Sequence, residues 1–153
     1  MFHDDPRPIA FENPGYQEAR HLFNLYNNDI TPVPVNSEGL DLASLPDSFK
    51  FVYVTPGCQF PTMVVMPEER QLQLLKKAEA AKAMVIEDDY EIGLVGHVKL
   101  KPALKSHDKN GRVIYVGSLS KTLSPSIRMG FIVAHRDLSL IHISEPTRRR
   151  GNS

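Results

Sequence analysis

Two segments of the chain concentrate side chains that could do chemistry. The segment Glu87–Tyr90 supplies three carboxylates and a phenol, and the segment Gly117–Arg128 supplies hydroxyls, an amine and a guanidinium. Each segment directly follows a run of apolar residues that is typical of a buried strand. Lys121, surrounded by the hydroxyls of the second segment, is the residue with the widest chemical range, because a lysine can bind phosphate or form a Schiff base with a carbonyl.

A phosphate-binding nucleotide loop is the first alternative for this lysine. That motif needs a glycine directly before the lysine and another five residues earlier. Ser120 and Tyr115 occupy these two places. The spacing therefore favours Schiff-base chemistry, which requires a partner with a carbonyl and neighbours that hold the phosphate of that partner.

The elements that must position these segments alternate between strands and helices. Apolar residues at spacings of three and four predict one helix from about Tyr16 to Asn27, with Asn13 and Pro14 at its start, and a second helix that opens at Pro67 and buries Leu74, Leu75, Ala78 and Ala81. One helical turn is expected over Leu40–Leu45. Strands are expected at Ile9–Phe11, Val33–Val35 (short and edge-like), Phe51–Val54, Ala83–Ile86, Val113–Val116 and Phe131–Ala134.

This alternation predicts an α/β fold with a mainly parallel, doubly wound sheet. In such sheets ligands bind beyond the carboxyl ends of the strands, where Glu87–Tyr90 and Ser118–Lys121 are expected to lie. The strand Phe131–Ala134 should run antiparallel to Val113–Val116, because the connection between them is too short for a helical crossover. Tyr16, Phe23 and Tyr26 are expected in the core.

The segments Glu87–Tyr90 and Ser118–Arg128 resemble the cofactor-binding signatures of fold type I pyridoxal-phosphate aminotransferases of class I/II. Further motifs resemble the aminotransferase-like domain of MocR-type regulators, a subgroup that fuses this domain to a GntR-type winged helix. The resemblance implies a partial large domain of a fold type I transferase over residues 1–137. The further motifs are Glu12–Tyr16 with Ala19-Arg20, Tyr53–Pro56, Gln59–Thr62 and Pro102–Lys105.

The resemblance implies that Lys121 forms an aldimine with pyridoxal 5'-phosphate. It implies that Asp88 pairs with the pyridine nitrogen and keeps it protonated, so that the ring can accept electrons. Asp89 is the alternative for this task, because neighbouring residues at a strand end point to opposite faces of the sheet. Asp88 is preferred over Asp89.

The remaining site residues also follow from the resemblance. Tyr90 would donate a hydrogen bond to the phenolate oxygen of the ring. Ser118 and Arg128 would hold the phosphate, and Ser120 is a further candidate for that task. The chain departs from the subgroup at Cys58, where a histidine is usual, at Met63, where a glycine is usual, and at Phe60, where many aminotransferases have an asparagine.

Two functions use these residues. The first is amino-group transfer between an amino acid and a 2-oxo acid through the Lys121 aldimine. The alternative is an effector-sensing domain of a MocR/GntR-type transcriptional regulator, in which an amino-acid-like effector binds at the same site. The resemblance also implies a homodimer, with DNA bound only through a domain outside this sequence, and leaves the substrate or effector unidentified.

Composition is consistent with a globular chain of the cytoplasm. Eighteen basic residues balance eighteen acidic ones among 153 residues, which argues against a large basic surface for nucleic acid. Cys58 is the only cysteine, so no internal disulfide can form, and it is expected to be an unreactive loop thiol. No apolar run is long enough to span a bilayer, and the six histidines lack metal-ligand spacing.

The end of the chain has a different character. Residues Leu138–Arg148 resemble the translation of a sequencing adaptor, so the native sequence is expected to end at about Asp137, with residues 138–153 as a non-native tail. Relative to complete family members, an earlier glycine-rich turn, the carboxy-terminal small domain and the winged helix are not found in this sequence. The fragment alone is therefore expected to be inactive and incompletely folded.

Overall fold

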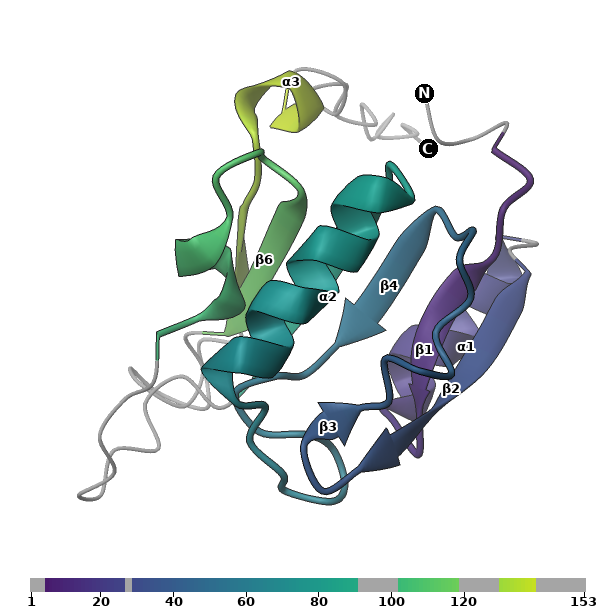
Figure 1. Ribbon diagram of the computed structural model, residues 1–153. Coiled ribbons are helices and arrows are strands. Elements are labelled where there is room, and N and C mark those ends of the chain that lie inside the picture. Colours follow the sequence, from purple (N-terminus) through teal and green to yellow (C-terminus); the bar gives the residue numbers. More distant parts are fainter. Residues whose placement is uncertain (1–4, 27–28, 91–101, 119–129, 140–153) are drawn as a thin grey trace, which may run out of the picture.

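The computed structural model describes residues 5–26, 29–90, 102–118 and 130–139. They form one seven-stranded sheet with helices on both of its faces (Figure 1). The strands are β1 (Ile9–Asn13), β2 (Ile30–Asn36), β3 (Gly39–Leu40), β4 (Phe51–Val54), β5 (Met84–Asp89), β6 (Val113–Ser118) and β7 (Gly130–Val133). The helices are α1 (Gln17–Leu25), α2 (Glu68–Ala80), the short 3-10 helix η1 (Leu104–His107) and α3 (Arg136–Ser139).

The sheet has the mainly parallel topology that the sequence predicts. Its strand order is β3-β2-β1-β4-β5-β6-β7, and the five strands from β2 to β6 in this order are parallel. The two edge strands, β3 and β7, are antiparallel to their neighbours. The predicted antiparallel orientation of the last strand is confirmed, because Ser118 pairs with Gly130 and Tyr115 pairs with Val133.

The chain reverses its direction of travel across the sheet between β1 and β4. From β1 it first adds β2 and β3 on one side, and it then returns to place β4 on the other side of β1. The ends of β1 and β4 therefore flank the topological switch point, where open α/β sheets usually bind their ligands.

The alternation of side chains along the strands builds two cores, one on each face of the sheet. On the α2 face, Leu74 and Ala78 of the helix pack with Ala10, Val52, Val54, Val85 and Val113 of the strands. On the α1 face, Ala19 and Phe23 pack against Ile9, Phe11, Tyr53 and Ile86. Figure 1 shows α2 in front of the sheet and α1 behind it. None of the helices in the described ranges is long and apolar enough to cross a membrane.

Helix α2 is confirmed, whereas the predicted start of α1 is wrong. Helix α1 begins at Gln17 and its N-cap is Tyr16, so Asn13 and Pro14 belong to the end of β1 and the turn after it. The turn needs its glycine, because a Cβ on Gly15 would lie 2.3 Å from the carbonyl oxygen of Glu12. The backbone therefore turns sharply before it can become helical.

Three smaller predictions also need correction. Residues 40–45 are not helical: Leu40 belongs to β3, and Asp41 closes a turn by accepting hydrogen bonds from Ser44. Strand β2 is longer than expected and pairs with β1 along five residues, so it is an inner strand beside the two-residue β3. Phe23 lies in the core as predicted, but Tyr16 and Tyr26 are 39% and 75% exposed.

Candidate functional site

The polar residues of the candidate site follow the ends of neighbouring parallel strands. Asp88 lies near the end of β5 and pairs with Val116 of β6, and Ser118 ends β6 two residues later. On the other side of β5, the end of β4 leads into Thr55, and the end of β1 carries Glu12. Because the carboxyl ends of parallel strands share one edge, β1, β4, β5 and β6 present these side chains together.

Asp88 and Asp89 lie on opposite faces of the sheet, as the alternation along the strand predicts. Asp88 follows Ile86 on the α1 face, where the hydroxyl of Tyr53 donates a hydrogen bond to its Oδ2. Asp89 accepts a hydrogen bond of 2.8 Å from the hydroxyl of Tyr115. Each carboxylate therefore has its own tyrosine donor, one from β4 and one from β6.

The surroundings of Asp88 make its carboxylate more basic than usual. Burial raises the pKa of Asp88, the hydrogen bond from Tyr53 lowers it, and the negative charge of Asp89 raises it. Burial and the neighbouring Asp88 raise the pKa of Tyr53 far above its ordinary range. Tyr53 therefore stays protonated over the working pH range and acts as a hydrogen-bond donor.

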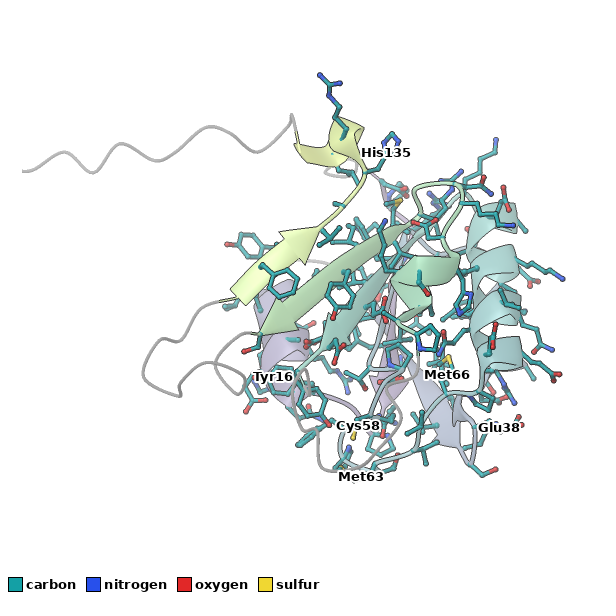
Figure 2. All side chains as sticks on the ribbon, turned by 90° about the vertical axis from the view of Figure 1, so that its left-hand side faces the viewer. Tyr16, Glu38, Cys58, Met63, Met66 and His135 are labelled. Carbon is teal, nitrogen blue, oxygen red and sulfur yellow. The ribbon has the colours of Figure 1, made fainter. Side chains whose placement is uncertain are left out.

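Aromatic rings line the same edge of the sheet. Phe60 lies between Tyr16 and Tyr90. The centroid of its ring is 6.0 Å from that of Tyr16 and 6.3 Å from that of Tyr90, and its ring plane is nearly perpendicular to both. Tyr16 and Phe60 are 39% and 40% exposed, so both side chains are partly accessible to solvent. Figure 2 shows Tyr16 with Cys58 and Met63 at this end of the molecule and His135 at the opposite end.

Behind the rings, Glu12 organises a buried hydrogen-bond cluster. Its Oε2 accepts hydrogen bonds from the backbone N–H of Thr55 (3.2 Å), the hydroxyl of Thr55 (2.7 Å) and the amide of Gln59 (3.3 Å). Burial raises the pKa of Glu12 to about 7, although these three donors lower it. Glu12 and Gln59 are 3% and 1% exposed. The cluster fixes the loop that carries Phe60.

Gln59 extends this cluster into its own loop. Its amide also donates to the carbonyl oxygens of Pro14 (2.9 Å) and Phe60 (2.6 Å). Its side-chain oxygen accepts from the hydroxyl and the backbone N–H of Thr62 (2.6 and 3.1 Å). One buried side chain therefore connects the turn after β1 with the loop after β4.

A second buried carboxylate, Glu87, anchors the chain on the α2 face of the sheet. It accepts hydrogen bonds from the backbone N–H groups of Leu104 (2.8 Å) and Lys105 (2.7 Å) at the start of η1. Burial raises the pKa of Glu87, and the two backbone donors lower it. This contact fixes η1 beside β5, one residue before Asp88.

The predicted site residues fall partly within the described ranges of the chain. Asp88, Tyr90 and Ser118 lie at the same edge of the sheet, and Asp88 and Ser118 share the α1 face by their strand positions. Lys121, Ser120 and Arg128 lie in residues 119–129, outside the described residues. The segment Glu91–Val98 also lies outside them.

Sequence reasoning missed the side chains that hold the site together. Tyr53 and Glu12 belong to motifs of the family resemblance, but the sequence alone assigned neither of them a task. Each had a signal, because a carboxylate that ends a wholly buried strand, or a phenol in the middle of one, needs a hydrogen-bond partner. The partners themselves, Asp88 and Thr55, lie on or after other strands and could not be identified from sequence spacing.

Comparisons with known proteins find relatives of this chain among transcriptional regulators and aminotransferases. The chain is 42% identical over 125 residues to "HTH-type transcriptional regulator TauR" of Rhodobacter capsulatus, which covers 82% of this chain and 26% of that protein. It is 38% identical over 140 residues to "Probable rhizopine catabolism regulatory protein MocR" of Rhizobium meliloti, covering 91% of this chain and 28% of that protein.

The fold is also that of a solved enzyme. The crystal structure of kynurenine aminotransferase from Pyrococcus horikoshii superposes with a TM-score of 0.80 and 31% identity, over 86% of this chain and 35% of that chain. The chain thus spans about a quarter of the length of these regulators and about a third of this enzyme. The family model described as "Aminotransferase class I and II" matches residues 1–153. The chain therefore belongs to the class I and II aminotransferase family.

Proposed function

We propose that the chain is the cofactor-binding, effector-sensing part of a transcriptional regulator of the MocR/GntR type. The observation that carries this proposal is the 42% identity to the regulator TauR across 82% of the chain, compared with 31% identity to the kynurenine aminotransferase. In such a protein, an amino-acid-like effector binds at the strand ends, and the response is transmitted to a separate DNA-binding domain.

The residues at the strand ends suit pyridoxal 5'-phosphate. A carboxylate, a phenol and a hydroxyl lie at this sheet edge beside partly exposed aromatic rings, which together suit a planar, protonatable ring with a hydroxyl and a phosphate. Bound there, the cofactor would supply an aldehyde that condenses with amines and a ring that withdraws electrons. The residues proposed to hold it are Lys121 (covalent attachment), Asp88 (ring nitrogen), Tyr90 (ring oxygen), and Ser118, Ser120 and Arg128 (phosphate).

The geometry of the described residues favours Asp88 over Asp89 for the ring nitrogen. Asp88 shares its face of the sheet with Ser118, the proposed phosphate ligand on the next strand. Asp89 lies on the other face, where its carboxylate accepts a hydrogen bond from the hydroxyl of Tyr115. The charge of Asp88 would hold the proton of the ring nitrogen in place.

An amino-acid transaminase is the second candidate. The observation that favours it is the TM-score of 0.80 with a solved kynurenine aminotransferase, an enzyme that covers 86% of this chain. Both candidates use the same cofactor residues and both imply a homodimer. They differ in the consequence of amino-acid binding, which is release of a 2-oxo acid by the enzyme and altered DNA binding by the regulator.

The test of the cofactor site uses the full-length protein that carries this domain. Lys121→Ala should abolish the visible absorbance of covalently attached cofactor, and Asp88→Asn should preserve it while weakening cofactor affinity. Asp89→Asn is the matched control and should leave affinity within about twofold of wild type. Unchanged absorbance in Lys121→Ala would refute the proposed site. A larger loss of cofactor affinity in Asp89→Asn than in Asp88→Asn would assign the contact with the ring nitrogen to Asp89 instead of Asp88.

A second experiment separates regulator from enzyme. The upstream reading frame should encode a winged helix, and an amino acid should change the affinity of the full-length protein for DNA upstream of its own gene. Conversion of an amino acid to its 2-oxo acid over many turnovers, with an added second 2-oxo acid accepting the amino group and no effect on DNA binding, would favour the transaminase instead.

A further inference from the structure

Tyr53 lies on β4, directly beside the carboxylate that is proposed to face the cofactor. We propose that Tyr53 is a positioning residue that holds Asp88 ionised and oriented toward the ring nitrogen of the cofactor. This inference rests on the proposed function, because Tyr53 acquires the task only if Asp88 binds that nitrogen.

The position of the Tyr53 hydroxyl is fixed by its surroundings. The ring is 5% exposed and stacks on Phe11 with a centroid distance of 4.5 Å and an angle of 10° between the planes. The ring of Phe23 packs against it in a T-shaped arrangement, with a distance of 6.4 Å between the ring centroids. Held from two sides, the ring directs its hydroxyl to Oδ2 of Asp88. That bond restricts the rotation of the carboxylate and orients its other oxygen.

The same hydrogen bond opposes the electrostatic cost of burying the charge. Asp88 is more than half buried and lies next to Asp89, and both effects favour the protonated acid. Glu12 lies close enough to interact with Asp88 electrostatically, and Tyr16 interacts in the same way with Tyr53. Among the groups named for Asp88, Tyr53 is the one that favours its charged form. A neutral acid would offer the protonated ring nitrogen no opposite charge, so the charge-assisted hydrogen bond would be lost.

The structure supplies a matched control on the opposite face of the sheet. Tyr115 donates to Asp89 at 2.8 Å, so it makes the same kind of hydrogen bond to the next residue of the same strand. Removing either hydroxyl changes one atom and preserves a phenyl ring. Only the loss of the Tyr53 hydroxyl should change the affinity for the cofactor.

The experiment measures the dissociation constant of pyridoxal phosphate against pH in the full-length protein, by absorbance. For Tyr53→Phe we expect about tenfold weaker binding at neutral pH, in line with the loss of one hydrogen bond to a charged group. The acid limb of the profile should move to higher pH, because Asp88 protonates more readily. Tyr115→Phe should change the constant less than about twofold and leave the limb in place.

A cofactor analogue with CH in place of the ring nitrogen isolates the proposed contact. Tyr53→Phe should change the affinity of this deaza analogue less than about twofold, because the analogue has no ring proton for Asp88 to hold. In an Asp88→Asn background, Tyr53→Phe should have no further effect on either ligand. Equal losses for cofactor and analogue, or equal effects of Tyr53→Phe and Tyr115→Phe, would overturn the proposal.

These outcomes also separate this inference from the proposed function. If Asp88→Asn weakens cofactor binding and Tyr53→Phe does not, the role of Tyr53 is wrong and the cofactor site stands. If wild type binds no cofactor, both are wrong. Should Tyr53→Phe fail to fold, replacing Tyr53 by 3-fluorotyrosine keeps the ring and gives a stronger donor, so the acid limb should move to lower pH; an unmoved limb would refute the proposal.

Discussion

The hydroxyl of Thr55 donates a hydrogen bond of 2.7 Å to the carboxylate of Glu12, and this bond joins the ends of β1 and β4. The two strands are adjacent in the sheet although β2 and β3 separate them in the chain. The bond therefore links the two strands that flank the topological switch point. It also fixes the loop after β4, because the same hydroxyl accepts the backbone N–H of Phe60 at 3.2 Å.

Glu12 should make the stability of the protein depend on pH. Burial raises its pKa from 4.5 to about 7, so the native state retains a proton that the unfolded chain releases above its lower pKa. Stability from this group is complete below about pH 4.5 and declines as the pH rises to about 7, by up to about 1.4 kcal/mol per pH unit. Urea unfolding of the full-length protein across this range measures the decline.

Glu12→Gln is the control for this titration, because its amide has the shape of the protonated acid and does not ionise. As the pH rises from about 5 to about 7, the unfolding free energy of wild type should fall relative to that of Glu12→Gln. Parallel pH profiles of the two proteins would show that Glu12 keeps its ordinary pKa.

Gly15 should tolerate no side chain. A Cβ at this position would lie 2.3 Å from the carbonyl oxygen of Glu12, and a backbone atom cannot move aside as a flexible side chain can. Gly15→Ala should therefore destabilise the protein by about 2 kcal/mol or more. Gly57→Ala is the matched control, because its Cβ would meet its nearest neighbour, Oδ1 of Asp89, at 3.8 Å. Thermal unfolding should separate the two variants, and equal melting temperatures would contradict the expectation.

Most of the sheet could be predicted from the sequence because its strands carry local signals. Apolar runs such as Phe51–Val54 and the helix that begins after Pro67 appear where the pattern of apolar residues puts them. The antiparallel β7 followed from the length of its connection. The start of α1 could not be predicted from the sequence, because proline and asparagine suit a helix start and a tight turn equally well. The choice between them depends on the contact of Gly15 with Glu12.

The site was less predictable than the sheet. The alternation along β5 gave the opposite faces of Asp88 and Asp89, and strand ends gave the shared edge with Ser118. The bond from Tyr53 to Asp88 depends on the register between β4 and β5, in which Tyr53 pairs with Ile86. Register is a property of the folded sheet, and a single strand sequence does not contain it.

Lys82 should be replaceable by glycine with a gain in stability. It follows the C-cap of α2 with φ at 51°, in the left-handed region, and its N–H bonds to the carbonyl of Glu79 while that of Ala83 bonds to Ala78. This is a Schellman end, where glycine is the preferred residue. Lys82→Gly should raise the unfolding free energy by about 0.5 kcal/mol, since relief of the left-handed strain exceeds the entropy cost of glycine.

The control for Lys82 is a lysine inside the same helix. Lys76→Gly adds the same residue where φ is helical, and it should lower the unfolding free energy by about 1 kcal/mol. The two variants have the same change in composition and charge. A gain at position 76, or a loss at position 82 as large as the one at 76, would show that the backbone conformation does not decide the outcome.

Met63 is the other non-glycine residue with positive φ in the described part of the chain. Its φ is 62° and its side chain is 61% exposed, with a weak interaction of 3.6 Å between its sulfur and that of Cys58. Met63→Gly should therefore raise the unfolding free energy by about 0.5 kcal/mol, because relief of the backbone strain outweighs this weak sulfur–sulfur interaction. Met63→Ala removes the same interaction but retains Cβ, so it should show no gain. Equal gains in both variants, measured by urea unfolding of the full-length protein, would assign the effect to the exposed side chain instead of the backbone.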